Sequence, residues 1–336
     1  MKYIDPIFII ILIILFNIFF FLNYSNISRL FKLYDLPDKK LKKHKNKAYP
    51  IGGIILFVNL IFFFFNDIYN DQLKLFNLNN FHLICFIISC TFIFVLGLLD
   101  DKANINYLIK FFILSLIFFI LLFIDKTLQI NELRIYIFSK NFSIDFLKIL
   151  MTTFFILLFT NAFNMFDGIN LQAGLYSVIV LTLFYLKITN ILFFLSLIII
   201  LLIFLFFNQM KNVFLGNSGS LLISFILSYY FIFSYNQNLI EYAEIIYLFM
   251  CIPGLDMFRL FLERAFLKKN PFKGDSNHLH HILVRNLGFK YSTIIIQGLI
   301  ISTLIIGLYF SISLGILFSL ITYFIIIFKY RDKKIK

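Results

Sequence analysis

The sequence is poor in charge: only 14% of its 336 residues are Asp, Glu, Lys or Arg, against about a quarter in a typical soluble domain. Apolar residues make up 61%, which is too much for one core of this size to bury. The surface of a soluble fold would then be apolar as well, and the protein would aggregate. The composition therefore argues against a soluble protein and predicts one embedded in a bilayer, where lipid accepts such a surface.

Cysteine is also scarce, since Cys85, Cys90 and Cys251 are the three present and all lie in apolar runs. Their odd number argues against a disulfide framework and favours small core residues. The first apolar run, Ile4–Tyr24, lacks a small-residue cleavage site, so we expect a retained span and not a signal peptide. With no internal repeat or low-complexity linker, the chain reads as a single integral membrane domain over residues 1–336.

Long apolar runs recur along the chain, and each spanning helix needs about twenty such residues. The last two runs are continuous; as one helix they would reach roughly 55 Å, so we expect a turn near Gly307–Gly315. The expected fold is an all-α, polytopic transmembrane bundle of about eleven spans. The predicted spans are Ile4–Tyr24, Ile51–Phe65, Phe81–Leu99, Tyr107–Ile124, Phe146–Phe163, Leu171–Leu186, Ile191–Phe207, Ser220–Tyr235, Ile245–Leu262, Ser292–Phe310 and Ser311–Phe328.

The basic residues indicate the orientation, because Lys and Arg stay in cytoplasmic loops. With the N-terminus outside, 21 of the 30 Lys and Arg fall in inside segments and seven in outside segments. Lys110 and Arg259 lie within predicted spans. The C-terminal tail is then cytoplasmic, and the location is the inner (plasma) membrane. This bias, with attraction to anionic lipids, explains the net charge of +13, so we expect no nucleic-acid partner.

Polar residues gather in the inside segments, and the first group is Asp100 and Asp101, directly after Gly97-Leu-Leu. Two adjacent carboxylates at the C-terminal end of a helix repel each other and are disfavoured by the helix dipole. Carboxylates kept in such a place often act as a base or a metal-linked pair. A solvated helix end is the alternative.

The second group consists of Asn161, Asn164 and Asp167, spaced so that they line one helical face, with Gly168 able to end the helix. Two amides and a carboxylate offer oxygen ligands for a hard cation and partners for phosphate or sugar. The alternative is hydrogen bonding between helices.

The third group is the stretch Phe214–Ser220, which opens a predicted span. Its glycines permit close backbone approach, and the free N–H groups of a helix start attract anions. A simple helix cap by Ser218 or Ser220 is the alternative.

The fourth group lies in a basic loop and contains three of the five histidines, His278, His280 and His281, together with Lys273. A His-x-His pair can bind zinc. Binding of a pyrophosphate or nucleotide through the imidazoles and Lys273 fits better. A fifth element, Asp38–Gly53, carries His44 and several lysines; a substrate role and a lipid-headgroup contact both stay open.

In this order, the motifs resemble the polyprenyl-phosphate N-acetylhexosamine-1-phosphate transferases of the glycosyltransferase family 4 type. The resemblance covers about residues 35–285, and the histidine pattern is similar to the branch that starts O-antigen, teichoic acid or capsule synthesis. The matching stretches are His44 to Gly53, Gly97-Leu-Leu-Asp-Asp, Asn-Ala-Phe-Asn-Met-Phe-Asp-Gly, Phe-Leu-Gly-Asn-Ser-Gly-Ser and Asn-His-Leu-His-His.

The resemblance implies that a UDP-N-acetyl amino sugar, such as UDP-N-acetylglucosamine, gives its sugar-1-phosphate to undecaprenyl phosphate and releases UMP. It implies Mg²⁺ as cofactor, with Mn²⁺ as an alternative. Two phosphate-bearing reactants repel each other, so a metal and basic residues are needed to bring them together. The amino sugar, the polymer and the oligomeric state stay open, a homodimer included.

By matching position, Asp100 and Asp101 would orient or deprotonate the lipid phosphate, and Asn164 and Asn217 would hold Mg²⁺. The family usually has Asp where this chain has Asn217, and an amide adds no charge, so we expect weaker Mg²⁺ affinity. Rival hypotheses are a transporter or lipid flippase and an inactive homologue. The substrate-binding residues implied are His44, Asn161, Asp167, Lys273, His278, His280 and His281.

Overall fold

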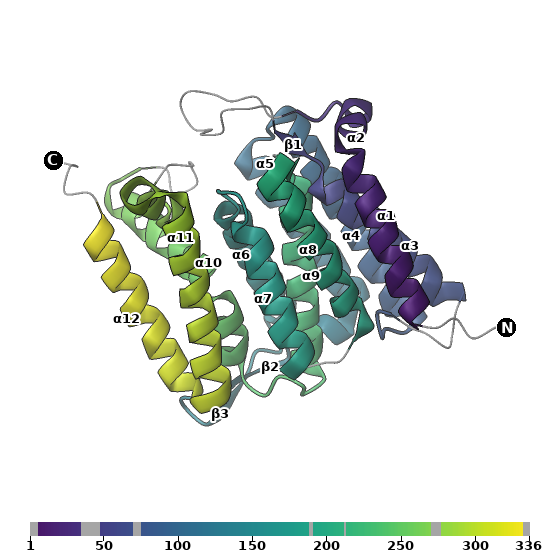
Figure 1. Cartoon of the computed structure of the whole chain (residues 1–336). Coiled ribbons are helices and arrows are strands. Elements are labelled where there is room, and N and C mark those ends of the chain that lie inside the picture. Colours follow the sequence, from purple (N-terminus) through teal and green to yellow (C-terminus); the bar gives the residue numbers. More distant parts are fainter. Residues whose placement is uncertain are drawn as a thin grey trace. The chain divides into compact units, whose positions relative to one another are not determined.

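The computed structural model describes residues 6–34, 48–69, 75–187, 191–211, 213–269 and 277–331. Within them the chain forms twelve α-helices and two short two-stranded sheets (Figure 1). Each of the eleven predicted apolar runs overlaps at least one helix among the described residues. The all-α fold class is therefore confirmed.

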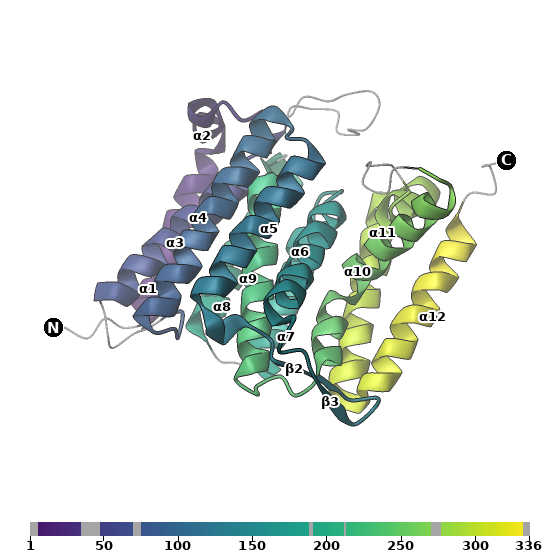
Figure 2. The same ribbon diagram turned by 180° about the vertical axis from the view of Figure 1, so that it is seen from behind.

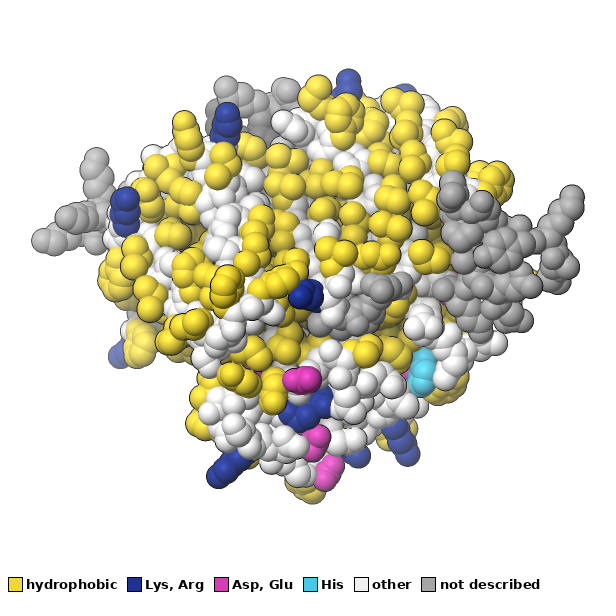
Figure 3. Space-filling view, turned by 60° about the horizontal axis from the view of Figure 1, so that its bottom comes forward, with side chains coloured by type: hydrophobic (Ala, Val, Ile, Leu, Met, Phe, Trp, Pro, Cys, Tyr) yellow, Lys and Arg dark blue, Asp and Glu magenta, His cyan; other side chains and the backbone are white. Residues whose placement is uncertain are grey.

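Among the described residues, nine helices are long and apolar enough to cross a membrane. A bent pair, α1 (Pro6–Leu22) with α2 (Tyr24–Phe31), meets the same test together, and the two helices are inclined by 69°. Apolar side chains cover most of the surface seen in Figure 3, as lipid-facing helices require. The chain is a multi-pass membrane protein; the exact span number and the orientation stay predictions.

The chain divides into two compact units. The first comprises residues 1–127 and 177–227, and the second comprises residues 128–176 and 228–336. Two helices, α7 (Gln172–Lys187) and α9 (Gly216–Asn236), contribute residues to both. Whether the whole chain folds as one domain stays a prediction.

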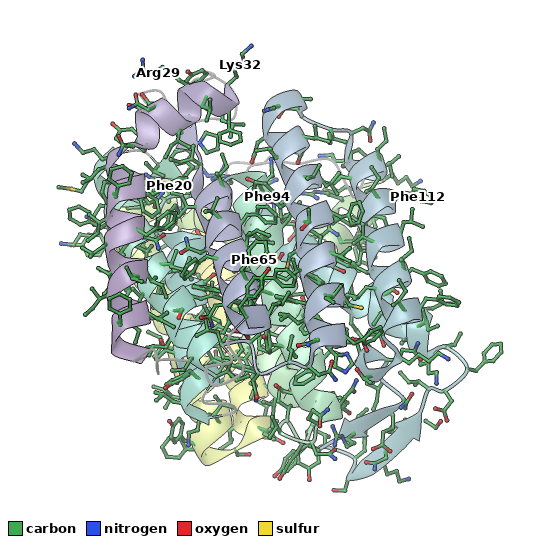
Figure 4. All side chains as sticks on the ribbon, turned by 90° about the vertical axis from the view of Figure 1, so that its right-hand side faces the viewer. Phe20, Arg29, Lys32, Phe65, Phe94 and Phe112 are labelled. Carbon is green, nitrogen blue, oxygen red and sulfur yellow. The ribbon has the colours of Figure 1, made fainter. Side chains whose placement is uncertain are left out.

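In the first unit α1 packs against α3 and α8, and α4 packs against both α3 and α5. Asn17 of α1 and Asn59 of α3 exchange two side-chain hydrogen bonds of 3.0 Å, which satisfies both buried amides inside the apolar bundle. Figure 4 shows Arg29 and Lys32 pointing away from one end of this unit. Its further elements are β1 (Tyr49–Pro50), α3 (Gly52–Tyr69), α4 (Asn80–Ala103), α5 (Tyr107–Ile124), η1 (Lys126–Leu128), α8 (Leu192–Lys211) and β4 (Val213–Phe214).

Two contacts join distant segments of the first unit. The rings of Phe57 and Phe94 stack with centroids 4.2 Å apart and hold α3 to α4. Strand β1 pairs in parallel with β4, with Tyr49 opposite Val213. The pairing places the chain that enters α3 beside the chain that enters α9.

In the second unit α6 packs against α10, and α10 packs against α11 and α12 (Figure 2). The hairpin β2–β3 is held by Arg134, whose guanidinium lies 4.0 Å from the ring centroid of Tyr235 and donates to the carbonyl of Ile240. The elements are β2 (Glu132–Ile135), β3 (Lys140–Ser143), α6 (Lys148–Phe166), α10 (Ala243–Phe266), α11 (Leu279–Ile305), the π-helical turn η2 (Ile306–Phe310) and α12 (Ile312–Tyr330).

The long C-terminal apolar run turns where the glycines predict. Ser311 is extended, with φ −161° and ψ 134°, and separates η2 from α12. A Cβ added to Gly315 would lie only 2.5 Å from the Cα of Gly307, so the missing side chains let the two segments fold back on each other. The predicted turn is confirmed.

Candidate active site

Asp100 lies in the last turn of α4, where a carboxylate is electrostatically disfavoured, and the structure shows what compensates it. Its Oδ2 lies 2.9 Å from Nζ of Lys110 on α5, and its Oδ1 accepts the N–H of Ile105 at 2.8 Å. Asp100 is 5% exposed, and the Lys110 side chain is 13% exposed. The solvated helix end that was the alternative is therefore wrong for Asp100, which forms a buried ion pair.

Asp101 reaches from the end of α4 to the start of α9. Its Oδ1 accepts the backbone N–H of Asn217 at 2.7 Å, and its Oδ2 accepts the N–H and the hydroxyl of Ser218 at 3.0 and 2.8 Å. A carboxylate at a helix N-terminus is favoured by the free N–H groups and by the dipole. The anion attracted by this helix start is thus a side chain of the protein itself.

Glycines allow this contact by letting helices approach very closely. A Cβ added to Gly97 would lie 2.4 Å from the Cα of Ser218, and one added to Gly53 would lie 2.4 Å from the N of Gly219. Gly216 has φ +74°, and its Cβ would lie 2.8 Å from Oδ2 of Asp101. The starts of α3 and α9 and the end of α4 therefore form one cluster, held by backbone contact.

In the second unit, the histidine motif lies against the end of α6. A Cβ added to Gly168 would lie 2.1 Å from Nε2 of His280, so the imidazole occupies the space that Gly168 leaves open. The His280 ring lies 5.4 Å from that of His278 and 4.2 Å from that of His281, between centroids. Asp167, which ends α6, therefore shares this region with all three histidines.

The histidines lie partly in a helix, and not wholly in the loop that we predicted. His278 precedes the first residue of α11, and His280 and His281 belong to its first turn. Gly288, with φ +80° and ψ 171°, interrupts the helix before the apolar stretch begins. Leu279, Ile282 and Leu283 lie at i, i+3 and i+4 and are buried, so this short apolar periodicity is the signal that could have found the helix before Gly288.

Asn161 and Asn164 lie in the last two turns of α6, and both are half-buried. The side-chain amide of Asn161 donates to the carbonyl of Leu157 at 2.7 Å. Asp167 follows Phe166, the last residue of α6, so it stays a prediction that the three side chains share one face. His44 and Lys273 lie outside the described residues, so their predicted roles stay predictions.

The described residues hold no group of three or more His, Cys, Asp or Glu side chains that could bind a metal ion. The zinc alternative for the histidines therefore receives no support there. Asn217 belongs to the first unit and Asn164 to the second. The Mg²⁺ assignment stays a prediction.

Comparison with known proteins identifies a family that this chain resembles. Residues 83–235 match the family model of glycosyl transferase family 4. The undecaprenyl-phosphate alpha-N-acetylglucosaminyl 1-phosphate transferase of Thermotoga maritima is 29% identical over 263 residues, which cover 76% of this chain and 74% of the relative. The chain is therefore similar to glycosyl transferase family 4 over this region.

Two further relatives support the similarity to glycosyl transferase family 4. The probable undecaprenyl-phosphate N-acetylglucosaminyl 1-phosphate transferase of Bacillus subtilis is 27% identical over 68% of this chain and 63% of its own. The undecaprenyl-phosphate alpha-N-acetylglucosaminyl 1-phosphate transferase of Salmonella typhi is 28% identical over 73% of this chain and 67% of its own. The family match contains the Asp100, Asn161 and Asn217 clusters and ends before the histidines.

Sequence reasoning missed two groups of polar residues in this chain. Lys110 was noted only as a charge within a span, although it pairs with Asp100. Arg259 was noted in the same way, and Asp256 was not considered, although both are buried on α10 and paired with each other. The signal that could have found them is the cost of a charge inside an apolar helix, which needs a partner and marks function by default.

Proposed function

We propose that this chain transfers N-acetylhexosamine-1-phosphate from a UDP-sugar to undecaprenyl phosphate, with N-acetylglucosamine as the first sugar to test. The names of the relatives support this substrate pair. The observation that carries the proposal is the cluster at the end of α4. There Asp101, which ends the Gly97-Leu-Leu-Asp-Asp motif, binds the start of α9, which belongs to the Phe214–Ser220 motif. We also propose the inner membrane as its location; a homodimer stays a prediction.

The reaction exchanges one phosphoanhydride for another. An oxygen of the lipid phosphate bonds to the β-phosphorus of the UDP-sugar, which carries the sugar. The bond from the β-phosphorus to the bridging oxygen breaks, and that oxygen leaves with UMP. Both reactants are anionic, so most of the catalysis consists of bringing them together and neutralising the charge that moves to the leaving group.

The first unit offers the groups for the lipid phosphate. Lys110 supplies a cation close to the end of α4, and its contact with Asp100 fixes where the ammonium lies. Asp100 would orient the lipid phosphate or accept its proton, as the resemblance implies. Asp101 holds the start of α9 through the backbone N–H of Asn217, whose side chain is half-buried.

These residues fit a hard cation chemically, because amide and carboxylate oxygens are the ligands that Mg²⁺ takes. Asn217 would contribute one amide oxygen, and the resemblance assigns a second to Asn164. The ion would neutralise the diphosphate of the UDP-sugar. With an amide at position 217 in place of a carboxylate, the protein contributes less negative charge, so we expect a high Mg²⁺ requirement.

The second unit offers groups for the UDP-sugar. The three histidines, next to Asp167 at the end of α6, would bind the diphosphate or uridine. An imidazolium N–H is a strong donor to a phosphate oxygen. Asn161 and Asp167 would contact the nucleotide or the sugar.

The test is UMP release by the purified protein in nanodiscs, with a panel of UDP-N-acetyl sugars as donors. We expect UMP with at least one donor, only when undecaprenyl phosphate and Mg²⁺ are present. An Asp100→Asn variant should lose more than 90% of this activity, an order-of-magnitude expectation for a group in the reaction centre. Absence of UMP with every donor would favour the transporter or the inactive homologue.

A further inference from the structure

Asp256 is the centre of a buried polar network in the second unit, formed within otherwise apolar helices. It lies on α10 and is 3% exposed. Its Oδ1 accepts hydrogen bonds from Arg259 at 2.9 Å, from the hydroxyl of Tyr323 at 2.8 Å and from the N–H of Leu279 at 3.0 Å. Its Oδ2 lies 2.9 Å from Nδ1 of His278. Residues of α10, α12 and the start of α11 therefore meet at one carboxylate.

The contact with Asp256 fixes the chemical form of His278. A carboxylate accepts hydrogen bonds, so Nδ1 of His278 must carry the hydrogen. The other ring nitrogen, Nε2, is then the atom left for another partner. A carboxylate behind a working imidazole sets its tautomer and orientation in this way.

The backbone on both sides of His278 is fixed by the same network. The N–H of Leu279 binds Asp256, and the carbonyl of Asn277 accepts a hydrogen bond from Arg259 at 2.7 Å. Two residues of α10, Asp256 and Arg259, thus hold the imidazole of His278 and the backbone groups on either side of it. A histidine that only filled space would not need three separate polar contacts.

Tyr323 of α12 completes the arrangement, because its hydroxyl donates to Asp256 and accepts from Nε of Arg259 at 2.8 Å. Burying ionic groups is expensive, and well-packed apolar residues commonly stabilise a core as well or better. Ionisable residues inside a membrane bundle are rare and mark functional sites. The network therefore points to a role for the residue it holds.

We infer that Asp256 is a positioning residue that holds the imidazole of His278 toward the UDP-sugar, with Arg259 and Tyr323 as its support. The inference rests on the proposed function, since it assigns the donor substrate as the partner of His278. It names a residue that does not itself contact the substrate. Its removal should weaken binding of the UDP-sugar and leave binding of undecaprenyl phosphate unchanged.

The kinetic experiment measures KM for each substrate and kcat in four forms: wild type, Asp256→Asn, His278→Gln and the double variant. We expect Asp256→Asn to raise KM for the UDP-sugar by about 10- to 100-fold, by analogy with the loss of partners that orient histidines at metal sites. The double variant should be no worse than His278→Gln, because Asp256 acts through His278. Effects that multiply would overturn the inference.

Two further variants serve as support and control. Tyr323→Phe removes one hydroxyl and keeps the ring, so it perturbs the fold less than Asp256→Asn and should raise the same KM by a smaller factor. Thr322→Val removes another hydroxyl of α12, one that donates to the carbonyl of Phe318 on the same helix at 2.5 Å and not to Asp256. We expect it to keep the wild-type KM, and a rise equal to that of Tyr323→Phe would contradict the inference.

Histidine ¹⁵N spectra separate the inference from the proposed function. In the wild type the His278 signal, assigned by its loss in His278→Gln, should show a protonated Nδ1; in Asp256→Asn it should shift. If the wild type releases no UMP from any donor, the proposed function fails, and the substrate part of the inference fails with it. An unchanged His278 signal in Asp256→Asn would overturn the positioning itself, whatever the activity.

Discussion

The pair of Lys110 and Asp100 gives the sharpest test of the site in the first unit. We consider Lys110→Met, which keeps the length of the side chain and removes its charge. The ammonium lies 2.9 Å from Oδ2 of Asp100, and the side chains are 13% and 7% exposed. The variant leaves the Asp100 carboxylate buried beside apolar residues with one backbone N–H as its partner.

The expected loss of stability depends on how deeply the ion pair is buried. At 2.9 Å and an effective dielectric constant of about 20, the attraction is about 6 kcal/mol, and most of it offsets the cost of desolvating the two charges. The intact pair therefore adds little net stability. Removing one partner leaves the other charge uncompensated, so Lys110→Met should lower the free energy of unfolding by about 3–5 kcal/mol. Asp100→Asn should cost a similar amount.

The assay is unfolding in mixed dodecylmaltoside and SDS micelles, followed by circular dichroism, for both single variants and the double variant. Because the double variant leaves no buried charge, we expect it to be more stable than either single variant, with a coupling of at least about 3 kcal/mol. It should still release no UMP, which separates the fold from the chemistry. Single effects that add within about 0.5 kcal/mol would refute the reasoning.

Three other variants, and a control outside the cluster, test its remaining parts. Gly97→Ala places a Cβ 2.4 Å from the Cα of Ser218, so it should abolish or strongly destabilise the fold. As a control, Gly298→Ala meets nothing within 4 Å among the described residues and should change the free energy of unfolding by less than about 1 kcal/mol. Equal effects of the two variants would contradict the close approach of α4 to α9. Asp101→Ala removes three hydrogen bonds from the start of α9 and should cost about 2 kcal/mol or more by micellar unfolding, and an unchanged stability would exclude this role. Asn217→Asp adds a charge and should lower the Mg²⁺ concentration for half-maximal UMP release, while no decrease would remove the support for Asn217 as a ligand.

The helices were predictable because lipid leaves few choices. A backbone in an apolar solvent must satisfy its own hydrogen bonds, so an apolar run of sufficient length becomes a helix. The turn near Gly307 and Gly315 was predictable for a related reason, since the run exceeds the bilayer and these glycines allow close packing. Local pattern and length decide both features.

The partners within the site were not predictable in the same way. Asp101 was expected beside Asp100, but its contact with the start of α9 joins residues far apart in the sequence, and periodicity carries no information on such a contact. Anion binding and a cap by Ser218 or Ser220 were the two readings of this helix start, and neither indicates that the anion is Asp101. A side chain from another helix is invisible to any reading of the local sequence.

Charges within spans were the signal that deserved more weight. Lys110 and Arg259 lie within predicted spans, so the comparison of basic residues in inside and outside loops does not use them. Each has its partner in a carboxylate, Asp100 and Asp256 respectively, as the cost of an isolated charge in lipid requires. A charge within a span therefore predicts a buried ionic partner, as found for Lys110 with Asp100 and for Arg259 with Asp256.

The most direct measurement follows a radioactive phosphate through the reaction. The purified protein is incubated with undecaprenyl phosphate and UDP-N-acetylglucosamine labelled with ³²P at either the α- or the β-phosphate. The account predicts that the β-label moves to the butanol-extractable lipid and that the α-label stays in water-soluble UMP. If both labels stay in the water phase, or both move to the lipid, the bond between the two phosphates is not the one exchanged, and the proposed transfer is wrong.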